Sequence, residues 1–158
     1  MAFVDATINN QNNAPIPANP LGAESFMASR SGAMAGSSGD EIVYETTRPA
    51  VLEIFEVGSN TPSAPRARVY ALTKTGGWEL VPLVVKADGS ALDGITPYTV
   101  RLHKPGAFDL VVDDSSTASY KFVLTRPLAF PLGLRIAVGN VTTTEKNIAV
   151  AVDGRLLK

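Results

Sequence analysis

The sequence predicts an all-β protein: an antiparallel β-sandwich of about eight or nine strands, Ig-like or jelly-roll-like, preceded by an extended N-terminal arm. From residue 41 onward, short runs of alternating apolar and polar residues are separated by turn-forming residues. No segment there has the apolar spacing of an amphipathic helix. A chain of 158 residues has room for one such domain, which we assign to residues 41–158.

The N-terminal arm, residues 1–40, has a different composition. It is rich in Asn, Pro, Gly, Ser and Ala, it has few charges, and its apolar residues are isolated from one another. Such a segment cannot bury enough apolar surface to offset the entropy that it loses on ordering. We therefore expect the arm to be mostly irregular and mobile in an isolated chain. A short helical turn is compatible with the composition of Gly22–Met34.

The first strands of the domain are expected at Glu41–Thr46 and Val51–Val57. A hairpin follows, because the turn Thr75-Gly76-Gly77 joins the expected strands Ala67–Lys74 and Trp78–Lys86. Asp-Gly pairs at residues 88–89 and 93–94 then mark a loop.

A second hairpin is expected around Pro105-Gly106, since Pro fits the first central position of a type II turn and Gly the second. The flanking strands, Tyr98–Lys104 and Ala107–Asp113, each alternate between an apolar and a polar face. Another strand follows at Ser119–Thr125. A proline-bounded connection (126–131) and a turn-rich stretch (139–146) then separate the last expected strands, Leu132–Val138 and Asn147–Val152.

The charge balance and the absence of cysteine exclude several classes of function. Fourteen basic and 15 acidic residues give a net charge of −1, so no single-signed field attracts nucleic acid or an anionic membrane. With no cysteine, the chain can form no disulfide, zinc-thiolate site or thiol nucleophile. The first residues do not resemble a secretion signal, and no apolar stretch is long enough to span a bilayer. We expect a soluble protein made in a cytoplasm.

No set of residues indicates catalysis, a cofactor or a metal. His103, the single histidine, lies on a polar strand face with no serine marked as its partner. Asp113 and Asp114 lack the spaced carboxylates and distal Glu of a calcium loop, so a solvated turn is the better interpretation. Trp78 could contribute to a sugar-binding platform, but a single Trp at the start of a strand more often covers a core. We expect a non-enzymatic protein.

The layout of the chain resembles that of small virion structural proteins of tailed bacteriophages, in particular capsid decoration (cement) proteins and head or tail appendages. The features that carry the resemblance are the Asn/Pro/Gly/Ser-rich arm, the Gly76-Gly77-Trp78 hairpin, the Asp-Gly loops, and the segment Tyr98–Val112. The resemblance implies binding to an assembled shell as a homo-oligomer, with a trimer favoured, while the arm lies along capsid or other virion subunits. The isolated apolar residues would be its partner-binding anchors: Phe3, Ile8, Ile16, Phe26 and Met27.

The leading hypothesis is therefore a structural component of a phage virion that decorates or stabilises the particle through its arm. The alternative is a carbohydrate- or receptor-binding module of a tail fibre or adhesin. Such a module would use loops at one end of the sandwich, such as Asp88–Thr96 or Asp113–Ala118.

Overall fold

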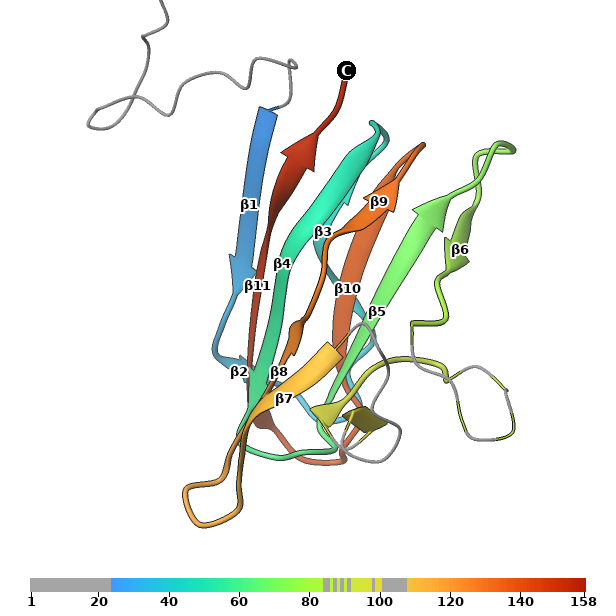
Figure 1. Cartoon of the computed structure of the whole chain (residues 1–158). Helices are drawn as coiled ribbons and strands as arrows, with labels where there is room; N and C mark the ends of the chain where they lie inside the picture. Colours follow the sequence, from blue (N-terminus) through green and yellow to red (C-terminus); the bar gives the residue numbers. More distant parts are fainter. Residues whose placement is uncertain are drawn as a thin grey trace, which may run out of the picture.

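The structure, a computed structural model, describes residues 24–83, 86, 88, 90, 92–97, 99–100 and 108–158. In these residues the chain forms two antiparallel sheets that pack face to face (Figure 1). The predicted all-β sandwich is confirmed.

The larger sheet has the strand order β1-β11-β4-β8-β7. Two short strands extend the sheet. β2 pairs with the first two residues of β11, and β9 pairs with the first three residues of β4. The bounds are β1 Glu24–Arg30, β2 Ala33–Met34, β4 Ala50–Ser59, β7 Phe108–Asp114, β8 Ser119–Leu124, β9 Leu128–Phe130 and β11 Lys146–Leu156.

The smaller sheet has four strands in the order β3-β10-β5-β6. Its central strand β10 is buried along most of its length, whereas β6 at the edge has three residues. The predicted hairpin of β5 and β6 is present, with Leu72 opposite Trp78. The bounds are β3 Glu41–Thr46, β5 Pro65–Leu72, β6 Trp78–Leu80 and β10 Leu134–Asn140.

The core lies between the sheets and is built from the inward-facing residues of their strands. Three phenylalanines of the larger sheet, Phe55, Phe108 and Phe122, meet edge to face with ring centroids 5.5–6.4 Å apart. Each such pair adds about 0.5–1.5 kcal/mol to the stability that burial of the rings provides. The smaller sheet contributes aliphatic side chains to the same core, such as Leu134 and Ile136, which are fully buried.

The beginning of the described chain differs from the sequence-based expectation. Residues 24–34 form β1 and β2, where we expected a helical turn within an irregular arm. The physical reason is pairing, because every residue of β1 faces a residue of β11, from Glu24↔Leu156 to Arg30↔Val150. Residues 24–34 of the expected arm therefore contribute two strands to the larger sheet, residues 35–40 connect them to β3, and residues 1–23 lie outside the described residues.

A second difference concerns Tyr98–Lys104, which we expected to be a strand. Pro97, Thr99 and Val100 have helical backbone, and the Val100 amide donates to the Thr96 carbonyl at 3.0 Å. Thr96 begins this turn, since its hydroxyl accepts from the Thr99 amide at 2.9 Å and Pro97 fits the first helical position. The rest of the expected strand and its Pro105-Gly106 turn lie outside the described residues.

Candidate protein interface

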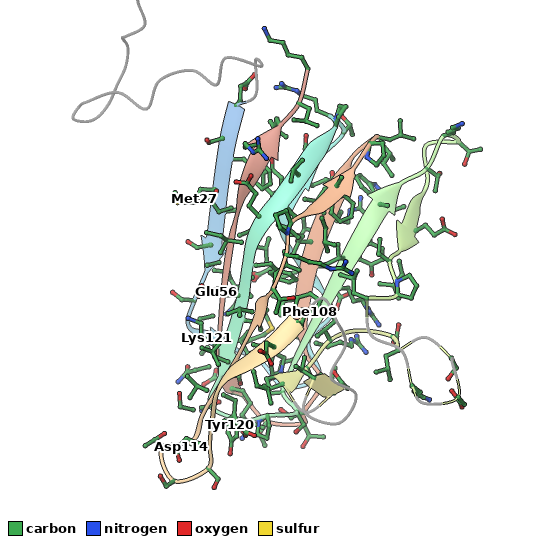
Figure 2. The ribbon with its side chains drawn as sticks, viewed as in Figure 1. Met27, Glu56, Phe108, Asp114, Tyr120 and Lys121 are labelled. Carbon is green, nitrogen blue, oxygen red and sulfur yellow. The ribbon has the colours of Figure 1, made fainter. Side chains whose placement is uncertain are left out.

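The structure separates the five anchors predicted from the sequence. Phe26 is 8% exposed, and its ring stacks on Tyr44 inside the sandwich, so it belongs to the core of this chain. Met27, the next residue, is 80% exposed on the opposite face of β1 (Figure 2). Phe3, Ile8 and Ile16 lie outside the described residues. Of the two anchors that the structure describes, only Met27 is accessible to a partner.

The strand that carries Met27 forms one edge of the larger sheet, because β1 pairs with β11 alone. Its pairing is continuous over seven residues with no bulge. Between Glu24 and Arg30 at its ends, the strand has no charged residue. A long, regular, uncharged edge strand exposes a row of backbone donors and acceptors to which another strand can pair.

The edge strands β7, β6 and β3 have features that discourage such pairing, and β2 and β9, which also lie at edges of the larger sheet, have only two and three residues. β7 has a register shift between Leu110 and Val112, and it carries three acidic residues, Asp109, Asp113 and Asp114. Bulges and charges are the usual means by which edge strands avoid association. Among the sheet edges that the structure describes, β7 is therefore a poor site for strand addition.

The two edges of the smaller sheet are also protected. β6 has only three residues. β3 carries Glu41 and Glu45, each in an ion pair, and its pairing with β10 shifts register between Ile136 and Ala137. In the part of the chain that the structure describes, β1 is the one sheet edge without a bulge, an internal charge or a short length.

Beside β1, the outer face of the larger sheet is open to solvent. Met27 faces Asp153, which in turn faces Ile54 of β4, so two apolar side chains flank a carboxylate in one row. Ile54 is 46% exposed. Both apolar side chains are accessible to a partner that reaches the β1 edge.

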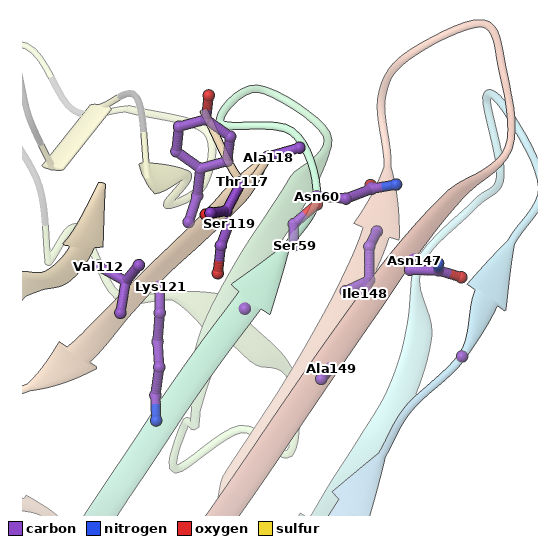
Figure 3. A pocket seen from close by; sticks show the side chains of 13 residues that line it. Ser59, Asn60, Val112, Thr117, Ala118, Ser119, Lys121, Asn147, Ile148 and Ala149 are labelled. Carbon is purple, nitrogen blue, oxygen red and sulfur yellow. The ribbon is translucent and has the colours of Figure 1, made fainter. Parts of the chain in front are cut away.

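Farther along this face, two adjoining shallow depressions have volumes of about 380 and 230 Å³. Small residues, Gly58 and Ala149, line both of them. Figure 3 shows the larger one, between the β7–β8 hairpin and the start of β11. Its lysine, Lys121, forms an ion pair with Glu56 at 2.6 Å. These depressions are open grooves on a sheet face.

The described residues contain no group of three or more His, Cys, Asp or Glu side chains placed to hold a metal ion. Asp88 and Asp114 each accept hydrogen bonds from the residue two positions later, Ser90 and Ser116. These bonds lower the pKa of both carboxyls. Both are turn-forming residues, as the sequence suggests. His103 lies outside the described residues.

Trp78, the candidate sugar platform, is partly covered by its own chain. The Arg135 guanidinium lies 4.5 Å from the centre of the indole ring, and Glu45 holds that guanidinium in an ion pair. One ring face is therefore occupied.

Among the described residues there is no helix long and apolar enough to cross a membrane.

Comparisons with known proteins do not show a family for this chain. No family model matches it, and no curated protein matches it. Two solved structures of infectious bursal disease virus proteins are similar to it at low level. The VP2 subviral particle has 9% identity and a TM-score of 0.23 over 86% of this chain and 41% of the viral chain. The structure of the Gx strain has 8% identity and a TM-score of 0.27 over 89% and 42%.

This chain therefore spans about two fifths of the length of those viral chains. At such TM-scores the likeness does not support an argument about function. The resemblance to tailed-phage proteins remains a prediction from the sequence.

Proposed function

We propose that this chain is a non-enzymatic structural component of a tailed-phage virion, made in the host cytoplasm. In this proposal its N-terminal region binds assembled capsid or other virion subunits, and the bound chain decorates or stabilises the particle. The observation that carries the proposal is the position of β1, the first described strand, at the one unprotected sheet edge of the described residues.

Residues 1–23 precede β1 in the sequence, and the first residue of β1, Glu24, pairs with Leu156 at the C-terminal end of β11 (Figure 1). An extended segment can bind a neighbouring subunit by pairing its backbone with an exposed strand, while isolated apolar side chains enter pockets on that subunit. Ile8 and Ile16 are isolated apolar residues of this segment. A segment without a core of its own can order when it docks.

The test uses the full-length chain and particles assembled without it. Replacing Ile8 and Ile16 together by Asp should reduce co-sedimentation with these particles at least tenfold. Val141→Asp, at a residue 43% exposed away from β1, is the matched control and should bind as the wild type does. Wild-type binding by the double variant would refute the proposal.

The boundary of the structured sheet determines which truncation is informative. Deleting residues 1–40 would remove β1 and β2 together with Phe26, so loss of binding could reflect unfolding. Deletion of residues 1–23 leaves both strands in place and is the truncation to compare.

A further inference from the structure

We propose that β1 is a self-association edge, at which two copies of this chain pair their β1 strands antiparallel about a twofold axis through Met27. The larger sheets of the two copies would then form one continuous sheet. This proposal rests on the described strands alone and does not depend on a role in a virion. It also differs from the threefold arrangement that the resemblance favours.

The first argument is that β1 is open to a partner strand. Its outward edge has no strand neighbour among the described residues, and the other described edge strands are short, bulged or charged. When the other described edges are protected and one seven-residue edge is regular, that edge is the obvious position for strand addition.

The second argument is that the sequence of β1, Glu-Ser-Phe-Met-Ala-Ser-Arg, is complementary to itself when reversed. With Met27 opposite its own copy, Ser25 faces Ser29, and Phe26 faces the small Ala28. Glu24 faces Arg30 at both ends of the ribbon, so opposite charges meet. A twofold interface requires this kind of self-complementarity, because the same surface serves both partners.

The charges also discriminate against parallel pairing. In a parallel, in-register pair of β1 strands, Glu24 would face Glu24 and Arg30 would face Arg30, and like charges directly opposite are destabilising. Both residues already have partners within the chain, Glu24 with Arg48 and Arg30 with Glu41. The charges of Glu24 and Arg30 therefore determine the direction and register of strand pairing more than they increase its affinity.

The third argument is the exposure of Met27. It is 80% exposed, the largest value among the exposed large hydrophobic residues of the described chain. The twofold axis places two copies of this side chain against each other on the outer face of the sheet and removes both from water. Because one pair of strands buries less area than a standard protein interface, we expect reversible, concentration-dependent dimers.

The test uses single-cysteine variants of the full chain, which has no native cysteine. Directly opposed residues in paired strands are within the range that a disulfide can bridge. Met27→Cys should therefore form a disulfide-linked dimer under mild oxidation at least tenfold faster than Val111→Cys. Val111, 58% exposed on the β7 edge, is the matched control.

Register is tested by mixing two further variants, Ser25→Cys and Ser29→Cys. Because Ser25 faces Ser29 of the other copy, the mixed heterodimer should form at least fivefold faster than either homodimer. Equal rates for Met27→Cys and Val111→Cys would overturn the proposal, and so would homodimers exceeding the heterodimer in the mixture.

A charge variant gives an independent readout without oxidation. Met27→Lys places two ammonium groups at the axis, and the exposure of this residue makes the substitution compatible with folding, which circular dichroism can verify. Sedimentation of this variant should show monomers at concentrations where the wild type and Val111→Lys form dimers. A wild-type chain that is monomeric at every concentration, or a trimer that persists in Met27→Lys, would disprove the proposal.

Discussion

The ring of Phe26 stacks on the ring of Tyr44, with centroids 4.2 Å apart and planes 7° from parallel. Phe26 belongs to β1 of the larger sheet and Tyr44 to β3 of the smaller one, so the stack joins the edge strands of the two sheets. The ion pair of Arg30 with Glu41, at 2.5 Å, links the same two strands. These contacts hold β1 within the sandwich in a single chain.

The first prediction concerns this stack. Phe26→Ala should lower the free energy of unfolding by about 3 kcal/mol, because it removes a buried ring and leaves a cavity. A double-mutant cycle with Tyr44→Ala should give a coupling energy of about 0.5–1.5 kcal/mol. Urea unfolding followed by circular dichroism measures both. Val141→Ala, an exposed control, should stay within about 0.5 kcal/mol of the wild type.

The opposite outcome would also be informative. If Phe26→Ala unfolds at the wild-type urea concentration, β1 does not pack on the sandwich in an isolated chain. The expectation of an N-terminal arm that is mobile up to residue 40 would then hold in solution.

The position of β1 shows what sequence patterns could and could not establish. The strands β3, β4 and β8 were predictable because they are rich in β-branched and aromatic residues, which favour strands. In β1, Phe26 and Ala28 alternate with Ser25, Met27 and Ser29, but Ala, Ser and Glu have little strand propensity and the apolar Met27 faces solvent. Its pairing with β11, more than 100 residues away, decides the conformation.

The second prediction concerns Gly154, which lies where β11 shifts register against β4. A Cβ atom at this position would lie 2.1 Å from the Val51 carbonyl oxygen and 2.6 Å from the Phe26 ring. Gly154→Ala should therefore destabilise the fold by about 1–3 kcal/mol, because the Val51 backbone cannot move aside easily. Gly58→Ala is the strand control, since its Cβ would approach its nearest neighbour only to 3.7 Å. Equal thermal unfolding midpoints for the two variants would contradict this account of Gly154.

The third prediction concerns Asn140, the one polar residue among the fully buried side chains described. Its amide nitrogen donates to the carbonyls of Met34 and Thr144, both at 2.9 Å, and its oxygen accepts from Thr142. Asn140→Asp replaces the donor by a carboxylate oxygen that faces two carbonyl oxygens. We expect a loss of about 2–4 kcal/mol at pH 7.

The pH dependence of the free energy of unfolding distinguishes the effect of the introduced charge in Asn140→Asp from that of the lost hydrogen-bond donor. Burial and the facing carbonyls favour the neutral acid, so the pKa of the introduced carboxyl should be raised in the folded state. Part of the lost stability should then return as the pH falls toward 4, measured relative to the wild type by urea unfolding. A difference from the wild type that does not change with pH would show that repulsion is not the cause. The burial of Asn140 and its hydrogen bonds give its amide a structural role.

The fourth prediction concerns alkaline pH. Burial raises the pKa of Tyr44 above its ordinary value of 10.0. Because the pKa of Tyr44 is higher in the folded state, the unfolded chain loses this proton at a lower pH than the folded chain does. The free energy of unfolding therefore falls as the pH rises past 10. Tyr44→Phe keeps the aromatic stack and removes the ionisable group, so it should show a shallower decline between pH 9.5 and 11. A variant that declines as steeply as the wild type would assign the alkaline sensitivity to other groups.

The candidate interface was predictable only in part, because exposure and edge position are properties of the assembled sheets. The arm hypothesis selected Phe26 and Met27 together, since adjacent apolar residues in a polar segment look equivalent in sequence. Strand geometry then directs them to opposite faces, and β11 on one side determines which face is the core. Ser25 and Ser29, two positions before and after Met27, are the signal that could have separated the two residues. In a strand, residues two apart share a face, so these serines indicate that Met27 lies on the polar face.

The fifth prediction concerns Arg68, which attaches the segment of residues 92–97 to β5. Its guanidinium donates to Asp40 at 2.5 Å and to both the carboxylate and the carbonyl of Asp93, at 2.6 and 2.7 Å. Beside it, the amides and carbonyls of Ala67 and Ile95 bond to each other in both directions. Arg68→Ala should increase hydrogen exchange at the Ile95 amide about tenfold, because opening of the segment then costs about 1.4 kcal/mol less.

Arg68→Lys should recover little of this protection, because an ammonium group cannot contact both carboxylates with the planar geometry of a guanidinium. Arg155→Ala is the control, since it removes an ion pair with Glu53 on the larger sheet and should leave exchange at Ile95 unchanged. If both alanine variants raise exchange at Ile95 equally, the effect is a general loss of stability and not the release of this segment. A selective effect of Arg68→Ala would identify these hydrogen bonds as the contacts that fix the segment against the sandwich.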